Sequence, residues 1–251
     1  IMTVELVNLV NGLSCYTTSQ REARLIYKEI YEDRCYDGFN LPDSPFIIDA
    51  GANIGLFSLY IKQQCPSATI LAFEPAPETY KILRQNLKLN NTAGVKPYAC
   101  GLSSNATAAK LVYFPHLPGN STLYPEDKVE IRRRFTQRYS EEVAAEVFGH
   151  SQEVDISLQR LSHFLDGYIG LERIDLIKVD VEGAELDVLL GVDDKYWDMV
   201  RNVVLETWAD SGVKPAIEEL LKGKGFDVVI EKTRSLPENT FIIRAYRDKA
   251  V

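Results

Sequence analysis

The sequence contains no apolar run that approaches the roughly 18 to 20 residues of a membrane-spanning helix, and it is short of positive charge. Lys and Arg number 28 against 36 Asp and Glu, so the formal net charge is −8. A chain with this deficit has no general electrostatic attraction to nucleic-acid phosphates or to anionic lipid. We therefore expect no nucleic acid and no membrane surface as its partner.

Paired cysteines and histidine clusters are also lacking. The four cysteines form no Cys-x-x-Cys motif, and the three histidines are not spaced as metal ligands. No leader sequence is recognised ahead of the first expected element. The expectation is a cytoplasmic protein whose thiols, Cys15, Cys35, Cys65 and Cys100, are free.

The pattern that is present predicts an α/β fold in a single domain, residues 1–251. Beyond Pro45, short apolar segments alternate with amphipathic ones, which is typical of a mostly parallel sheet with helices on both faces. The expected strands are Phe46–Asp49, Thr69–Phe73, Val95–Ala99, Ile174–Asp180, Val200–Glu206, Phe226–Glu231 and an antiparallel last strand, Thr240–Tyr246. The expected helices are Ile54–Gln64, Pro77–Asn90, Gly183–Leu190 and Pro215–Lys222.

Two segments fall outside this alternation. Residues 1–45 predict a hairpin with a type I′ turn at Asn11-Gly12, then a helix with a capping box at Ser19 and Glu22. Residues 115–150 predict a helical lid insertion, preceded by a strand at Lys110–Phe114. Apolar residues recur every four positions and predict one helix there: Ile131, Phe135, Tyr139, Val143 and Val147. Its arginines are interpreted as a solvated face: Arg132, Arg133, Arg134 and Arg138.

The first strand of the alternation runs through small residues directly into a helix. Gly51 and Gly55 allow a ligand to lie against the backbone amides of that turn, but their spacing does not fit the dinucleotide fingerprint, which disfavours a nicotinamide-dependent oxidoreductase. Glu74 follows the second strand, where a carboxylate can accept two hydrogen bonds from a ribose diol. Gly51, Asn53 and Glu74 are therefore expected to converge on a nucleoside-like ligand.

Three stretches carry a resemblance to a known family: Asp49-Ala-Gly-Ala-Asn-Ile-Gly55, Phe73-Glu-Pro75 and Ile174 to Glu185. The chain resembles the FkbM-type methyltransferases of the class I, Rossmann-like fold from about Ile47 to Trp208. The segment Gly119-Asn-Ser-Thr-Leu123 is similar to one often found in that family. The insertion departs from the family pattern and leaves the substrate open.

The resemblance implies a seven-stranded sheet, S-adenosyl-L-methionine as methyl donor with S-adenosyl-L-homocysteine as product, and O-methylation of a hydroxyl. The acceptor would be a small molecule or a carrier-bound polyketide, peptide or sugar intermediate, and the chain can be part of a larger synthase. The donor-binding residues carried over are Asp49, Gly51, Ala52, Asn53, Gly55, Glu74, Pro75, Cys100, Gly101 and Asp180. Ser121, Thr122 and Trp208 are the expected acceptor contacts. Nothing in the sequence predicts an oligomeric state.

Methyl transfer to a hydroxyl requires a group that accepts its proton. Asp180 and Glu206 end neighbouring strands, and either is a candidate base; Glu182 is a third candidate, or a helix-terminal acid. Lys178 points to the same side of its strand as Asp180, so we expect it to pair with a carboxylate. His150, at the end of the insertion, is a further candidate base.

Four alternatives stay open. Asp180, Glu182 and Glu206 can instead gather Mg²⁺. The accepting atom can be nitrogen or carbon instead of oxygen. N-methylation of nucleic-acid bases is a third alternative, but it commonly uses an Asn/Asp-Pro-Pro-Tyr/Phe motif, and this chain has Asp180-Val-Glu-Gly183 at that place. A non-catalytic module that binds an S-adenosyl ligand or a partner is the remaining reading.

Overall fold

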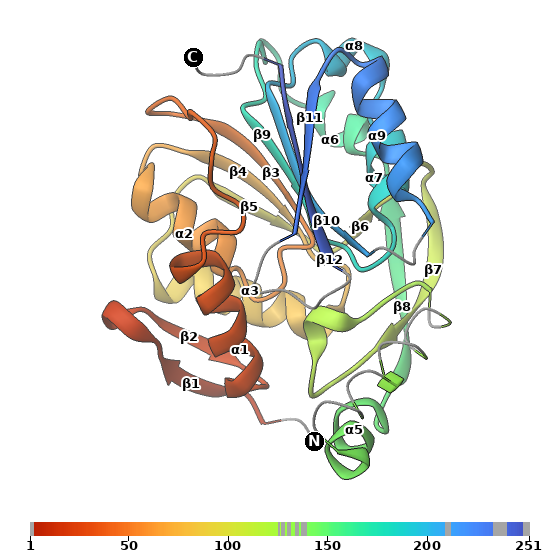
Figure 1. Ribbon diagram of the computed structural model, residues 1–251. Coiled ribbons are helices and arrows are strands. Elements are labelled where there is room, and N and C mark those ends of the chain that lie inside the picture. The colour runs from red at the N-terminus through yellow and green to blue at the C-terminus, as the bar shows by residue number, and fades with distance from the viewer. Residues whose placement is uncertain are drawn as a thin grey trace.

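The centre of the molecule is a seven-stranded sheet in the order β11-β12-β10-β9-β3-β4-β5 (Figure 1). The computed structural model describes residues 3–247 apart from 125, 127, 128, 130, 131, 134, 135, 137–139, 209–211 and 233–239. The sheet strands are β3 (Phe46–Ala50), β4 (Thr69–Phe73), β5 (Val95–Tyr98), β9 (Leu176–Val179), β10 (Asn202–Trp208), β11 (Asp227–Glu231) and β12 (Thr240–Tyr246). Only β12 runs antiparallel to its neighbours β10 and β11. The expected mostly parallel sheet with an antiparallel last strand is confirmed.

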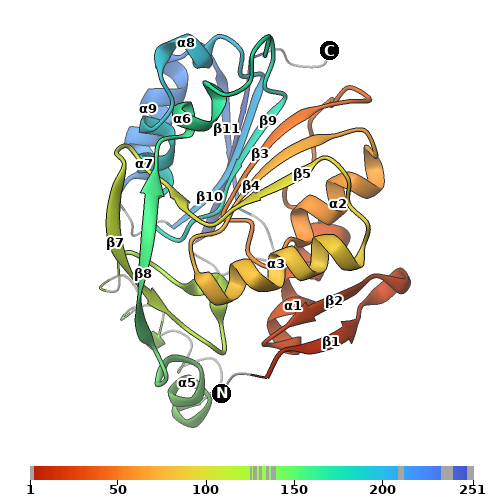
Figure 2. The ribbon, with the colours of Figure 1, turned by 180° about the vertical axis from the view of Figure 1, so that it is seen from behind.

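Helices cover both faces of this sheet, as Figures 1 and 2 show from opposite sides. One face carries α1 (Gln20–Tyr27), α2 (Leu56–Gln64) and α3 (Pro77–Leu89), and the other carries α6 (Leu161–Leu165), α7 (Glu185–Leu190), α8 (Asp194–Trp197) and α9 (Lys214–Gly223). Successive side chains of a strand point to opposite faces. Ile47 accordingly packs in the first core and Ile48 in the second, both fully buried.

The helix α3 illustrates why the amphipathic segments fold as they do. Pro77 occupies its first turn, where a missing N–H costs nothing. Its buried residues recur at helical spacing along one side: Thr79, Ile82, Leu83, Asn86 and Leu87. The buried Asn86 amide contributes a tertiary contact, because it donates to the Tyr16 and Ile54 carbonyls and accepts the Tyr16 N–H.

A second, three-stranded sheet was only half expected. It consists of β6 (Gly101–Leu102), β8 (Gln152–Gln159) and β7 (Thr107–Tyr113), in that order. The predicted strand at Lys110–Phe114 is the second half of β7, whereas β8 was missed. Figure 2 shows β7 and β8 as a ribbon that extends beyond the main sheet toward α5 (Glu141–Phe148).

The prediction of one continuous helix across residues 131–147 is wrong. Ser140 is not helical, and α5 begins at Glu141. Ile131, Phe135, Tyr139, Arg134 and Arg138 lie outside the described residues, as do the side chains of Val143 and Val147. Arg132 and Arg133 are exposed, and Arg132 forms an ion pair of 2.8 Å with Glu141. The lid role of this insertion stays a prediction.

The N-terminal hairpin forms, but its turn differs from the prediction. β1 (Glu5–Asn8) pairs antiparallel with β2 (Ser14–Thr17) across a 3₁₀ turn at Val10–Gly12, in which Gly12 has a φ of +76°. The two-residue type I′ turn is therefore wrong, because Asn8 pairs with Ser14 and leaves a longer loop.

The capping box at the start of α1 forms only in part. The Ser19 hydroxyl caps α1 by accepting the Glu22 N–H at 3.3 Å. The carboxylate of Glu22 does not return to Ser19; it accepts the N–H of Gly119 at 2.8 Å. After α1 the chain continues into a π-helical turn, Lys28–Glu32.

Two expectations about the chain as a whole can be compared with the fold. Among the described residues, no helix has both the length and the apolar character needed to cross a membrane. All four cysteines are free; Cys15, Cys35 and Cys100 are buried and Cys65 is half-buried. The expectation of unpaired thiols is confirmed.

Candidate active site

The carboxyl ends of β4, β3, β9 and β10 lie side by side in the sheet, so the loops that follow them meet at one edge. Asp49 and Gly51 come from the end of β3, Glu74 from β4, Asp180 from β9 and Glu206 from β10. The predicted site residues on these strands therefore converge, although they are separated by up to 157 positions between Asp49 and Glu206.

The turn after β3 brings two backbones into close contact. Gly51 has a φ of +78°, and a Cβ at this position would lie 1.8 Å from the backbone oxygen of Asp180. The amides of Gly51 and Ala52 both donate to the Phe73 carbonyl, at 3.1 and 2.9 Å. Gly55, with a φ of +95°, then starts α2. Gly51 is thus required for the approach of β9 to the turn.

Glu74 is joined to the same turn by its side chain. One carboxylate oxygen accepts the Asn53 N–H at 3.0 Å, and the other accepts the Ala76 N–H at 2.9 Å. Burial raises the pKa of Glu74 to about 7, although these two hydrogen bonds act to lower it. The Oδ1 atom of Asn53 is buried and has no hydrogen-bond partner in the described structure. These acceptors lie where the sequence predicted a nucleoside.

Lys178 is the buried cation beneath this edge. Its ammonium donates to Asp49 Oδ1 at 3.1 Å and to the Gly51 carbonyl at 2.8 Å, and lies 3.7 Å from Asp180 Oδ2. Burial lowers the pKa of Lys178, but the carboxylates of Asp49 and Asp180 outweigh this effect and raise it. The predicted pairing of Lys178 with a carboxylate is confirmed. Asp49 is fully buried, and its second oxygen accepts the Ser58 hydroxyl at 2.8 Å, so it holds Lys178 and the turn in place.

Tyr36 joins the two candidate bases and was not among the predicted site residues. Its hydroxyl donates to Asp180 Oδ2 at 3.0 Å and lies 3.5 Å from Glu206 Oε2. Burial and the nearby Asp180 raise the pKa of Glu206 well above its ordinary value, because both disfavour the charged form of this carboxyl. Burial and the same carboxylates raise the pKa of the Tyr36 hydroxyl.

Glu182, two positions after Asp180, is held by a contact with Thr122. Glu182 has a φ of +55°, and its backbone carbonyl accepts the Thr122 hydroxyl at 2.7 Å. Thr122 is fully buried and also accepts the Tyr124 N–H, so it positions the Glu182 loop; its predicted contact with an acceptor stays a prediction. Ser121 is half-buried, and its hydroxyl accepts the Phe114 N–H at 3.2 Å.

The loop that carries Ser121 and Thr122 also lies against the turn that follows β3. Gly119, in the 3₁₀ turn Pro118–Asn120, lies between Glu22 and Asn53: a Cβ there would lie 3.0 Å from Glu22 Oε1 and 2.9 Å from Asn53 Nδ2. Burial raises the pKa of Glu22 to about 8, and the Gly119 hydrogen bond only partly offsets this. The sequence indicated only a capping-box role for Glu22, so the longer-range contact between Glu22 and Gly119 was not predicted.

Four other predicted site residues have separate surroundings: His150, Trp208, Cys100 and Gly101. His150 is exposed, its ring lies 5.7 Å from that of His116, and no described contact joins it to the carboxylates. Trp208 ends β10 opposite Thr240 and is half-buried. Cys100 packs in the core on the α6–α9 face, and burial raises its thiol pKa to about 11. Gly101 begins β6 next to Pro75.

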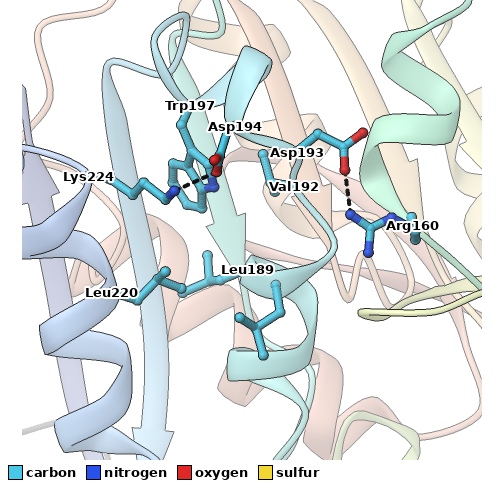
Figure 3. Close-up of a pocket in the computed structure, with 9 residues that line it drawn as sticks. Arg160, Leu189, Val192, Asp193, Asp194, Trp197, Leu220 and Lys224 are labelled. Carbon is cyan, nitrogen blue, oxygen red and sulfur yellow. Dashed lines mark hydrogen bonds and ion pairs between the residues drawn. The ribbon is translucent and has the colours of Figure 1, made fainter.

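Two further features of the molecule concern ligand binding: groups of metal-ligating side chains and a surface hollow. No group of three or more His, Cys, Asp or Glu side chains in the described structure is arranged to hold a metal ion, and Mg²⁺ binding stays a prediction. A surface hollow of about 420 Å³ lies between α7, α8 and α9, with Leu189 and Trp197 in its lining (Figure 3). Its charges are paired, Arg160 with Asp193 at 2.5 Å and Lys224 with Asp194 at 2.6 Å, and it contains no predicted site residue.

Comparison with known proteins places the chain among methyltransferases. Residues 49–245 match the family model of the methyltransferase FkbM domain. The protein named methyltransferase sdnD from Sordaria araneosa is 53% identical over 98% of this chain and 97% of its own length. The 31-O-demethyl-FK506 methyltransferase FkbM from Streptomyces tacrolimicus is 33% identical over 91% of each chain.

A solved structure shows the same fold. The methyltransferase FkbM from Methylobacillus flagellatus KT aligns with a TM-score of 0.57 and 15% identity over 88% of this chain. The alignment covers 48% of that protein, so this chain spans about half of its length. The two share the Rossmann-like fold of class I methyltransferases, as the strand order indicates.

Proposed function

Because this chain belongs to the FkbM family of S-adenosylmethionine-dependent methyltransferases, we propose that it is an O-methyltransferase for a hydroxyl of a small or carrier-bound natural-product intermediate. The observation that carries this proposal is the carboxyl pair Asp180 and Glu206, joined through one tyrosine hydroxyl. The Asp180 side chain is 33% exposed, so an acceptor can reach it. The oxygen named in the Streptomyces tacrolimicus relative supports the same accepting atom.

The turn after β3 and the end of β4 fit the methyl donor. Asn53 offers a buried carbonyl oxygen that no described residue satisfies, and such a group costs free energy unless a ligand or water bonds to it. Each carboxylate oxygen of Glu74 holds one backbone N–H and retains capacity for a second donor, as a ribose diol would supply. We propose that Gly51, Ala52, Gly55 and Pro75 line this site with them.

The carboxyl pair supplies what a hydroxyl acceptor needs. S-adenosylmethionine, when bound, supplies a methyl group on a positively charged sulfur, which keeps the electron pair of the broken carbon–sulfur bond. The acceptor oxygen forms the new bond to carbon and loses its proton to Asp180, so charge and atoms balance. Of the two carboxyl groups we assign Asp180 as the proton acceptor, because burial and Asp180 disfavour the charged form of Glu206. General-base help of this kind contributes about 10²-fold to 10⁴-fold in rate.

The remaining residues at this edge have supporting roles. Lys178 is held by Asp49 and by the Gly51 carbonyl, and its ammonium faces Asp180 at 3.7 Å, so it helps to position that carboxylate. Thr122 holds the backbone of Glu182 beside the pair. We propose Trp208, two positions beyond Glu206 on β10, and Ser121 as contacts for the acceptor.

The first experiment measures donor binding and then transfer. We expect S-adenosylhomocysteine to bind the purified chain at micromolar concentration in a calorimeter, whereas NAD does not bind. Transfer of a labelled methyl group to hydroxylated natural-product intermediates should follow, and mass spectrometry of the product identifies the methylated atom. Product methylated on nitrogen or carbon would contradict the proposal.

Variants connect the transfer to the carboxyl pair. Asp180→Asn should lower kcat by about 10²-fold or more, because it removes the proton acceptor, and leave the Kd for S-adenosylhomocysteine nearly unchanged. Asp193→Asn is the control, because its carboxylate pairs with Arg160 at the surface hollow, and it should retain full activity. A folded Asp180→Ala, Glu206→Ala double variant that methylates at the parental rate would refute the proposed mechanism.

A further inference from the structure

We propose that Tyr36 is a positioning residue for methyl transfer, because its hydroxyl fixes the Asp180 carboxylate toward the acceptor and links it to Glu206. This inference rests on the proposed O-methylation. Tyr36 precedes the segment that matches the family model, residues 49–245, so nothing in that match assigns it a role.

The contacts of Tyr36 select one oxygen of Asp180. The tyrosine hydroxyl, at 3.0 Å, and the Lys178 ammonium, at 3.7 Å, both face Oδ2. With Oδ2 occupied in this way, Oδ1 is the oxygen that an incoming hydroxyl can meet. A fixed carboxylate orientation matters because proton transfer requires a donor–acceptor distance of about 2.6–3.2 Å.

The same hydroxyl joins the two carboxyl groups into a chain of hydrogen bonds. A tyrosine hydroxyl donates one hydrogen bond and can also accept one. The shorter distance, 3.0 Å, makes Asp180 the acceptor of the tyrosine proton, and Glu206 Oε2 lies 3.5 Å from the same oxygen. In the proposed order Glu206, whose charged form is disfavoured by burial, donates to the tyrosine oxygen, and Asp180 accepts the proton of the acceptor hydroxyl.

The scaffold around Tyr36 is built to hold it. Arg244, a buried residue of β12, donates to the carbonyls of both flanking residues, Cys35 at 2.6 Å and Asp37 at 3.0 Å. The Tyr60 hydroxyl donates to the Asp37 carboxylate at 2.7 Å. The sheet therefore fixes the backbone on either side of Tyr36.

The Tyr36 ring is held as firmly as its backbone. It meets Phe57 edge to face, with ring centroids 5.6 Å apart, and the Lys178 ammonium lies 5.6 Å from its centroid. The side chain is 7% exposed. A tyrosine needed only for packing would not require its hydroxyl between two carboxyl groups.

The test is Tyr36→Phe, which keeps the ring and removes the hydroxyl. We expect kcat with a hydroxylated acceptor to fall about tenfold or more, with the KM for S-adenosylmethionine within about twofold of the parent. The acidic limb of the kcat against pH profile should move to higher pH, because the ionised pair loses a hydrogen-bond donor. The other charged groups that face the pair stay in place: Lys178 from β9, Glu29 from the π-helical turn, and Glu182 and Glu185 before and within α7.

Tyr31→Phe is the matched control. Tyr31 packs against the same hydrophobic core as Tyr36, but its hydroxyl donates to the Leu56 carbonyl at 3.4 Å and not to a carboxylate. This variant should leave both kcat and the pH profile unchanged. If Tyr36→Phe and Tyr31→Phe behave alike, Tyr36 has only a packing role and the inference is overturned.

A second measurement needs no acceptor. Infrared spectra of the protein with S-adenosylhomocysteine should contain a carboxylic-acid band that Glu206→Gln removes, that Tyr36→Phe shifts and that Tyr31→Phe leaves in place. An unshifted band in a folded Tyr36→Phe variant would also overturn the inference. If the parent methylates no hydroxyl, the proposed function fails on that result, and this band still decides whether Tyr36 holds the carboxyl pair.

Discussion

At the scale of single residues, Lys178 connects stability to chemistry. Its ammonium is 3% exposed and faces Asp49, which is fully buried, and Asp180, which reaches solvent. Removing one partner of a buried pair leaves an uncompensated charge, which costs more than the pair itself contributes. The lysine therefore stabilises the fold and also contacts the proposed base.

Lys178→Met should lower the free energy of unfolding by about 3–5 kcal/mol, because Asp49 is left buried without its partner. Lys195→Met is the matched control: Lys195 pairs with Asp166 at 2.6 Å but is 59% exposed, so its loss should leave the free energy of unfolding nearly unchanged. Urea unfolding measures both. Equal losses in the two variants would show that the Lys178 pair is not the buried interaction described here.

Single residues also show where sequence reasoning succeeds. The pairing of Lys178 was predicted because a lysine in an apolar strand requires a partner, and the convergence of Asp180 and Glu206 follows from parallel strands ending at one edge. Tyr36 carries no comparable signal. It lies 144 positions from Asp180, outside the stretches that carry the family resemblance.

At the scale of elements, the β3 turn depends on the absence of one Cβ atom. Gly51 and Gly12 have nearly the same φ, +78° and +76°, but they differ in their surroundings. A Cβ on Gly12 has nothing within 4 Å, whereas one on Gly51 would overlap the Asp180 carbonyl. Alanine substitutions at the two glycines therefore distinguish two energetic costs. Both substitutions force a left-handed backbone conformation on alanine, and only the one at Gly51 also creates an overlap with Asp180.

Gly12→Ala should cost about 1–2 kcal/mol of stability, the left-handed penalty alone. Gly51→Ala should cost more than about 4 kcal/mol, since β9 has to move away from the turn, and any folded fraction should lose affinity for S-adenosylhomocysteine. Thermal unfolding and calorimetry measure the two effects. A Gly51→Ala protein that is as stable as Gly12→Ala would contradict the close approach.

The elements also show why part of the fold escaped prediction. The strands of the main sheet are apolar and bounded by turn residues, so their pattern is strong. The strand β8 reads Gln-Glu-Val-Asp-Ile-Ser-Leu-Gln and buries only Ile156 and Leu158. Its apolar residues alternate over a short stretch next to the expected insertion. Its partner β7 lies 39 positions away at the pair Tyr113 and Gln152 and 51 positions away at the pair Thr107 and Leu158. Long-range pairing of this kind is not encoded in local periodicity.

At the scale of the whole molecule, buried acidic side chains near the carboxyl edge of the main sheet take up protons as the chain folds. Burial raises the pKa of Glu22 to about 8 and the pKa values of Glu29, Glu74 and Glu185 to about 7, from an ordinary value of 4.5. Between those values the folded state holds more protons than the unfolded state. The free energy of unfolding therefore falls as the pH rises from about 5 to about 8, and levels off above that.

Urea unfolding at pH 5 to 9 should reveal this decline. Glu22→Gln should flatten its upper part, near pH 7 to 8, because the amide keeps an oxygen for the Gly119 N–H but does not ionise. The acidic groups facing Glu22 are Glu182, Glu29 and Glu74, and these keep the rest of the slope. Glu78→Gln, at a position 51% exposed and paired with Lys81, should leave the pH dependence of the parent intact. A parent whose stability rises from pH 5 to 8 would refute the burial of these acids.

Residues 3–45, ahead of β3, contribute no strand to the main sheet, yet they deliver Tyr36, Glu22 and Glu29 to the carboxyl edge of that sheet. A chimera that joins residues 46–251 to the leading segment of another relative would thus exchange three ionisable groups of the centre while every strand of the main sheet stayed native. Recombination at that junction would retune the reaction without rebuilding the fold. Engineers who transplant the domain should carry the leading segment with it.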